Sequence, residues 1–304
     1  MRRSIKIVAA AMCTSAASLL LTAVAGAAPA PTAERWALLI GVSDYQPPTV
    51  TTPGSANDAR DMRDVLVRAG WPQDHLRVLI DGDATAGAIR EGMDWLADKS
   101  SPNSFSVVHF SGHTKQMESN FDDGDAEEWD EYLWAVDNEF ISDGEFGERM
   151  RALEGHAWIN VSNCEAAGFD DGVSSPNRLF TAASEEDEKG YERSDTQRSI
   201  YTGLLAGAFL NKHGDADRNG AVSIQEAFGV AAAAAPQLSV NGEYGPQHPV
   251  MAGGDNTQWF LKSPTPKEQT PTQQKSLLPP GLIPPWLIPP GLLPEWILPV
   301  PQTP

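Results

Sequence analysis

Cysteine is almost absent from this 304-residue chain, which contains only two. Cys13 lies within an apolar N-terminal stretch, so Cys164 is the one cysteine expected in the processed protein. A single remaining cysteine excludes an intramolecular disulfide framework. Its thiol is then either a small buried apolar group, which is the more frequent case, or a reactive group.

Basic side chains are also scarce, since 22 Lys and Arg stand against 41 Asp and Glu, for a formal net charge of −19. Such an acidic chain is a poor nucleic-acid binder, because its charge repels phosphates. The N-terminus departs from this balance. Basic residues precede an apolar stretch over residues 7–24, and small residues follow at 25–27. This pattern predicts a signal peptide over residues 1–27 and a secreted protein, extracellular or associated with the cell envelope. An uncleaved membrane anchor is the alternative.

Apolar runs alternate with helical periodicity over residues 34–262. Trp36–Val42 is an almost continuous apolar run, as in a strand covered on both faces. Further strands are predicted at 76–80, 104–110, 132–137 and 157–161, and helices at 57–69, 85–99, 143–153, 199–210 and 226–235. This alternation predicts one α/β domain, a βαβ sandwich with a mostly parallel central sheet.

Two of the predicted strands end in reactive side chains. The strand 104–110 leads to Gly112 and His113, and the strand 157–161 leads to Ser162 and Cys164. Because reactive groups gather at the carboxyl edge of an open α/β sheet, we expect the two ends to lie side by side. His113 would then move the proton while the Cys164 sulfur attacks a carbonyl carbon. The backbone amides of Gly112 and Cys164 are candidate oxyanion donors.

Six short segments in order resemble the caspase-like cysteine peptidases, and within them the secreted bacterial relatives of metacaspases. They are Ala37–Tyr45, Ala56–Ala59, Phe110–His113, the acidic stretch leading to Ala135–Asp137, Ser162–Cys164 and Leu179–Ser184. The resemblance implies a caspase-like fold, a His113–Cys164 dyad and cysteine endopeptidase activity on peptides or proteins.

The resemblance also implies a pocket for a basic substrate side chain, held by Asp58 and by an Asp two residues before the cysteine. Here that second position is Ser162, and Thr114 replaces the usual glycine after the histidine. Glu165, next to the nucleophile, compensates if its side chain turns into the pocket. We therefore expect cleavage after Arg or Lys. The alternative is a catalytically impaired binding protein that keeps the fold and acts through its cleft or its tail.

The segment Asp215–Glu226 fits the twelve-residue EF-hand loop, with a glycine at its sixth position. The expected Ca²⁺ ligands are Asp215, Asp217, Asn219, Ser223 and Glu226, together with the backbone carbonyl of Ala221. Calcium is thus the expected cofactor. The competing interpretation is an acidic turn between two helices.

Residues 263–304 form a Pro-rich linker followed by a ten-residue repeat with Leu, Ile and Trp. Frequent prolines exclude a spanning helix and favour extended polyproline structure. The apolar side chains indicate docking to a cell-envelope or protein partner, while a disordered tail without a partner is equally compatible. The oligomeric state stays open.

Overall fold

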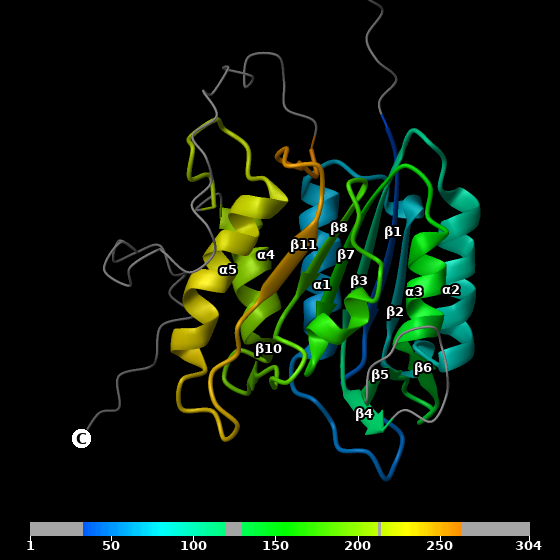
Figure 1. The fold of residues 1–304 in the computed structure, drawn as a ribbon, viewed down its shortest axis with the longest axis vertical. Coiled ribbons are helices and arrows are strands. Elements are labelled where there is room, and N and C mark those ends of the chain that lie inside the picture. Colours follow the sequence, from blue (N-terminus) through cyan, green and yellow to red (C-terminus); the bar gives the residue numbers. More distant parts are fainter. Residues whose placement is uncertain (1–32, 119–128, 212–213, 263–304) are drawn as a thin grey trace, which may run out of the picture. The chain divides into compact units, whose positions relative to one another are not determined.

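A six-stranded sheet forms the centre of the computed structural model, which describes residues 33–118, 129–211 and 214–262 (Figure 1). In spatial order β11-β8-β7-β3-β1-β2, the strands are Val250–Gly253, Arg178–Ala182, His156–Ser162, Ser104–Ser111, Glu34–Gly41 and Leu76–Ile80. The pairings from β8 to β2 are parallel, and β11 alone joins antiparallel. The predicted α/β fold with a mostly parallel sheet is confirmed.

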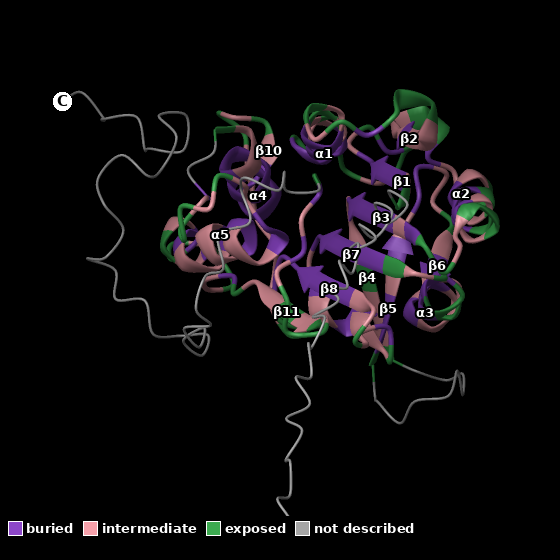
Figure 2. Cartoon of the chain, turned by 90° about the horizontal axis from the view of Figure 1, so that it is seen from above, coloured by how far each residue is buried: buried purple, intermediate pink, exposed green. Residues whose placement is uncertain are grey.

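Helices cover both faces of this sheet (Figure 2). On one side lie α1 (Ser55–Arg68), α4 (Ile200–Asn211) and α5 (Ile224–Leu238), and on the other α2 (Ala86–Lys99) and α3 (Asp143–Arg151). Coverage of both faces explains the apolar run of β1, where Ala37 to Ile40 are fully buried.

Smaller elements complete the domain. A three-stranded antiparallel sheet consists of β4 (Thr114–Glu118), β5 (Trp129–Trp134) and β6 (Phe140–Ser142). A short two-stranded ribbon consists of β9 (Glu192–Arg193) and β10 (Arg198–Ser199). Single 3₁₀ turns span Gln73–His75, Asp81–Asp83 and Ala166–Asp170. The strand predicted at 132–137 is found three residues earlier, as β5.

Helix α5 corrects one boundary. The sequence predicted a helix over 226–235 ended by Pro236, but α5 begins at Ile224 and continues to Leu238. Its early start follows from a capping box, in which Ser223 and Glu226 each satisfy the other's backbone amide. In the last turn a proline removes only one helical hydrogen bond, and the Ser239 amide still reaches the Ala235 carbonyl at 3.0 Å.

The predicted signal peptide (1–27) and Pro-rich tail (263–304) lie outside the described residues. Within the described ranges, no helix has both the length and the apolar character needed to cross a bilayer.

Candidate active site

The carboxyl ends of β3 and β7 bring His113 and Cys164 to one cavity. These strands pair in parallel with Ser111 opposite Ser162, and each candidate residue lies two positions beyond its serine. Both residues line a cavity of about 230 Å³. Its other lining residues are Thr51, Thr52, Pro53, Gly112, Ser162, Asn163, Ala183, Gly190, Tyr191, Glu192, Ser199 and Gln247.

Two contacts orient His113. Its backbone amide donates to the Tyr45 hydroxyl at 2.6 Å, and the two rings lie 4.9 Å apart. Its Nε2 lies 2.9 Å from the carbonyl oxygen of Val50. Because a carbonyl only accepts, Nε2 carries the proton in this contact, which leaves Nδ1 as the basic nitrogen of the neutral ring.

The Cys164 thiol is half-buried, with Sγ 3.7 Å from the carbonyl oxygen of Gly190. Burial, together with the nearby charge of Glu165, raises the pKa of this thiol to about 11. At neutral pH the thiol therefore keeps its proton. Among the described contacts no hydrogen bond joins Cys164 to His113, so the arrangement requires proton removal during the reaction, by a base that approaches the sulfur.

Gly112 cannot carry a side chain without displacing its neighbours. A Cβ atom there would lie 2.6 Å from the Tyr45 hydroxyl and 3.1 Å from the ring of Phe110. Glycine therefore permits the hydroxyl of Tyr45 to reach the amide of His113, in addition to bringing the backbone of residue 112 to the cavity.

Asp58 lies behind the cavity wall and is fully buried in the first turn of α1. Its carboxyl group accepts hydrogen bonds from the Ser111 hydroxyl at 2.8 Å and from the Ser199 amide at 3.1 Å. Burial first, and then the charge of Glu192, raise the pKa of Asp58 to about 8. Asp58 is therefore mostly protonated at neutral pH, which weakens it as a direct partner for a cation.

The two positions next to the nucleophile differ. Ser162 lines the cavity, and its hydroxyl lies 3.0 Å from that of Ser199. Glu165 is buried outside the lining and forms an ion pair with Lys189. Its backbone adopts the left-handed region, with φ of 48°. The sequence-based idea that Glu165 turns into the pocket is thus not met, because Lys189 holds its carboxylate. Thr114 begins β4, opposite Leu133.

Sequence reasoning missed several residues of this site, chiefly Tyr45 as the support of His113, and Glu192, Ser199 and Gln247 in the cavity lining. Glu192 accepts hydrogen bonds from the Ser55 hydroxyl at 2.6 Å and from the Gly54 amide at 2.8 Å. In the sequence, Glu192 stands among charged residues after β8, and no pattern there distinguishes it from solvent-exposed acidic residues.

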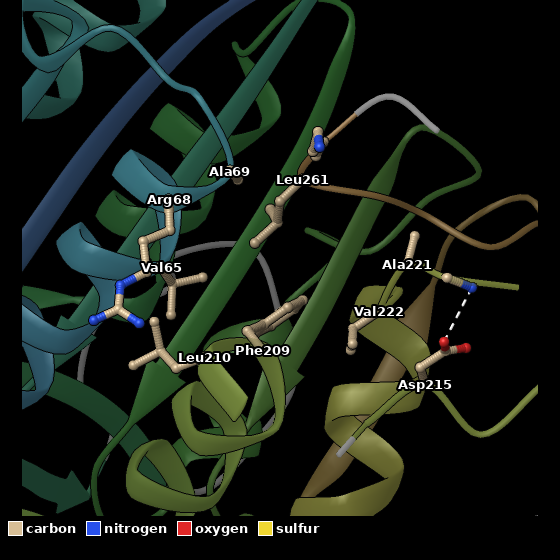
Figure 3. Close-up of a pocket in the computed structure, with 11 residues that line it drawn as sticks. Val65, Arg68, Ala69, Phe209, Leu210, Asp215, Ala221, Val222 and Leu261 are labelled. Carbon is tan, nitrogen blue, oxygen red and sulfur yellow. Dashed lines mark hydrogen bonds between the residues drawn. The ribbon is translucent and has the colours of Figure 1, made fainter. Parts of the chain in front are cut away.

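The candidate calcium loop brings three carboxylates together. Asp215, Asp217 and Glu226 each offer an oxygen, and these atoms lie within 4.8 Å of one another. Asp215 Oδ2 accepts from the Gly220 amide at 3.0 Å (Figure 3). Its Oδ1 is buried without a hydrogen-bond partner among the described residues. An oxygen-only set with one such atom fits a hard cation.

Two of the remaining predicted ligands, Asn219 and Ser223, also accept hydrogen bonds within the loop. Asn219 Oδ1 accepts from the Ala221 amide at 2.9 Å. The buried Ser223 hydroxyl accepts from the Glu226 amide at 3.2 Å and lies 2.9 Å from Glu226 Oε2, as part of the cap of α5. The set of six ligands therefore stays a prediction, within which the three carboxylates lie close enough to share one ion.

A cavity of about 390 Å³ lies beside this loop, between the ends of α1 and α4 (Figure 3). Its walls include Val65, Phe209, Val222 and Leu261, with Asp215 at one side. Although larger than the His113–Cys164 cavity, it is lined by no cysteine, serine or histidine.

Fold and site together define a class, the α/β proteins with a cysteine and a histidine at adjacent strand ends of a mostly parallel sheet. The particular family follows from comparison with known proteins. The chain belongs to the caspase-domain family, whose family model, described as Caspase domain, matches residues 34–243.

Individual relatives agree with this assignment. The chain is 27% identical to Metacaspase-4 of Arabidopsis thaliana over 169 residues, 53% of this chain and 40% of the relative. It is 31% identical to Metacaspase-1 of Eremothecium gossypii over 116 residues, 36% of this chain and 25% of the relative. The chain thus matches less than half the length of either metacaspase. Among solved structures, a crystal structure of a Geobacter sulfurreducens protein superposes with a TM-score of 0.57 at 14% identity. That superposition covers 75% of this chain and 98% of the other, and it supports the fold alone.

The chain matches the caspase-domain model and shares partial sequence similarity with these metacaspases. The resemblance read from the sequence is therefore confirmed at the level of the family.

Proposed function

We propose that this protein is a secreted cysteine endopeptidase that uses Cys164 as nucleophile and His113 as general base and acid, and that cleaves after Arg or Lys. The observation that carries the proposal is the convergence of both side chains on one cavity at the carboxyl ends of β3 and β7.

The reaction follows from the contacts of His113. With Nε2 held by the Val50 carbonyl, Nδ1 takes the thiol proton as Cys164 Sγ attacks the scissile carbonyl carbon. The backbone amides of Gly112 and Cys164 receive the oxyanion. His113 then gives its proton to the leaving amine, and the C–N bond breaks. Water, deprotonated by His113, hydrolyses the thioester and restores the thiol.

Replacement of either dyad residue tests this function. Because the pair acts as a unit, Cys164→Ala and His113→Ala should each lower kcat/KM on a peptide library by at least about 10³-fold. His156→Ala is the control, since this exposed histidine begins β7 at the opposite end of the strand. Wild-type turnover in Cys164→Ala would remove the proposal.

A second function, a non-catalytic binding protein, is favoured by the raised pKa of Cys164 and by serine at position 162. It predicts no cleavage by the wild-type protein, together with peptide binding that survives Cys164→Ala. Alkylation with iodoacetamide separates the two functions further. If His113 activates the thiol, His113→Ala should slow the reaction at neutral pH, whereas an inert thiol should react equally slowly in both proteins.

The loop Asp215–Glu226 is our proposed calcium site, with Asp215, Asp217 and Glu226 as ligands. The support is the closeness of their oxygens and the buried, unpartnered Asp215 Oδ1. Bound calcium would supply positive charge that neutralises these carboxylates and connects the end of α4 to the start of α5.

Calcium should raise the melting temperature by mass action. At about 1 mM calcium and a Kd of about 10⁻⁴ M, the stabilisation is about 1.4 kcal/mol, or a few degrees in this size of domain. Asp217→Asn should abolish the shift while leaving the melting temperature in chelator nearly unchanged, because Asp217 is exposed. Asp195→Asn, an exposed acid outside the loop, is the control. An equal melting temperature with calcium and with chelator, and no heat of binding in calorimetry, would exclude the site.

Secretion remains a prediction from the N-terminal pattern alone, and partner docking through residues 263–304 remains a prediction from composition. Both depend on segments outside the described residues.

A further inference from the structure

We propose that Glu192 supplies the negative charge that position 162 lacks, and that it selects a guanidinium or ammonium side chain in the His113–Cys164 cavity. This inference rests on the proposed function and assigns a specificity-determining residue to the same site.

Glu192 lies in the cavity wall beside Ser162. It pairs with Ser199 across the β9–β10 ribbon, and the Ser199 hydroxyl lies 3.0 Å from that of Ser162. Ser199 therefore lies between Glu192 and Ser162, paired with the first through the ribbon and in contact with the second through its hydroxyl. All three residues line the cavity with Cys164, whereas Asp58 and Glu165 do not. Glu192 is thus the carboxylate that faces the nucleophile's cavity.

Hydrogen bonds offset part of the effect that burial has on Glu192. Burial raises the pKa of Glu192 above its usual value, and hydrogen bonds from Ser55 and from the Gly54 amide limit that rise. The Gly54 amide stands at the start of α1, where the helix dipole favours an anion. Gly54 itself packs tightly, since a Cβ there would lie 2.6 Å from the backbone of Arg198. The ribbon and the helix start are therefore fixed against each other.

Glu192 also retains capacity for a ligand. A carboxylate has about four acceptor sites, and Glu192 accepts from the Ser55 hydroxyl, the Ser55 backbone and the Gly54 amide. A guanidinium or ammonium group can donate to the site that is left. Asp58 lies behind the cavity wall, and burial together with the charge of Glu192 raises its pKa, so that it adds no second full charge beside the cavity.

The isosteric variant Glu192→Gln removes this charge with little change in shape. We expect kcat/KM for a peptide with Arg before the cleaved bond to fall by about 10–100-fold. For the same peptide with Leu at that position, kcat/KM should change less than about threefold. Glu186→Gln, an exposed residue of the same β8–β9 connection, is the matched control. Adding Ser162→Asp to Glu192→Gln should restore part of the preference for Arg, because it returns a carboxylate to the adjacent wall. Unchanged Arg-over-Leu selectivity in Glu192→Gln would overturn the assignment.

Binding without turnover separates this inference from the proposed catalysis. In the Cys164→Ala background, calorimetry with N-acetyl-arginine amide and N-acetyl-leucine amide should show preference for the arginine compound, lost on Glu192→Gln and kept on Glu186→Gln. This pattern supports Glu192 even if the wild-type protein cleaves nothing, in which case only the proposed catalysis fails. Equal affinity for both compounds in the Cys164→Ala protein, or arginine preference that survives Glu192→Gln, contradicts the inference.

Discussion

Strands β3 and β7 carry two polar clusters on one face of the sheet, two residues apart along each strand. The deeper cluster centres on the paired residues His109 and Asn160, and the upper one on Ser111 and Ser162. The deeper cluster is fully buried. Asn160 Nδ2 donates to His109 Nδ1 at 2.8 Å, and its Oδ1 accepts from the hydroxyls of Thr181 and Tyr201, both at 2.8 Å. The upper cluster, in contrast, reaches the cavity.

Burial shifts the pKa values in both clusters, downward for a base and upward for an acid. It lowers the pKa of His109 to about 3, whereas it raises the pKa of Asp58, which is hydrogen-bonded to Ser111, to about 8. In each case the neutral form is favoured, because a low-dielectric interior penalises charge. The comparison indicates that the deeper cluster holds the sheet and its helices together. The upper cluster lies next to Glu192, a carboxylate that can still accept a hydrogen bond.

The largest difference between the two clusters is expected in stability, from Asn160→Leu in the deeper cluster. The change removes the central partner of His109, Thr181 and Tyr201 and leaves buried polar groups unsatisfied, which should lower the free energy of unfolding by about 3–5 kcal/mol. Ser162→Ala, in the next position of the same strand face, should cost about 1 kcal/mol or less. The Ser199 hydroxyl keeps the Thr202 amide as a partner there, at 3.1 Å.

Urea denaturation at pH 7 measures both variants, with m-values as the check on two-state unfolding. Equal losses for Asn160→Leu and Ser162→Ala would erase the distinction between a structural cluster and a functional one.

The sequence carried enough information for the frame of the site. Apolar runs located β1, β3 and β7, and the parallel alternation placed their carboxyl ends together. Reactive side chains just beyond two of the strands then made His113 and Cys164 the candidate pair, and both line one cavity. The helix predicted over 85–99 is found as α2, and Thr85 is its N-cap, with a hydroxyl that accepts from the Ala88 amide at 3.1 Å.

The rest depended on contacts distant in sequence. Glu192 reaches the site through a ribbon whose strands have two residues each, too short for any periodicity. Glu165 could compensate only if its side chain turned into the pocket, and that depends on Lys189, 24 residues away, which binds its carboxylate. Histidine and asparagine inside apolar strands, at alternate positions with Ser111 and Ser162, were the available signal for the deeper cluster.

A smaller effect concerns pH and the deeper cluster. The pKa of His109 is about 3 in the folded protein and about 6.5 when unfolded, so below pH 6.5 the unfolded chain binds a proton that the folded chain does not. Stability is therefore lost as pH falls from about 6.5 toward 3. The variant His109→Gln lacks this titration, while its side-chain oxygen can still accept from Asn160.

Between pH 6 and 4, the free energy of unfolding of the wild-type protein should consequently fall more steeply than that of His109→Gln, by up to about 1.4 kcal/mol per pH unit. His156→Gln is the control, because it removes an exposed histidine from the start of the same β7 strand and should leave the slope unchanged. Urea denaturation at several pH values gives the three slopes. If His109→Gln and the wild-type protein lost stability in parallel, His109 would take up its proton within the fold, and the deeper cluster would be open to water like the one above it.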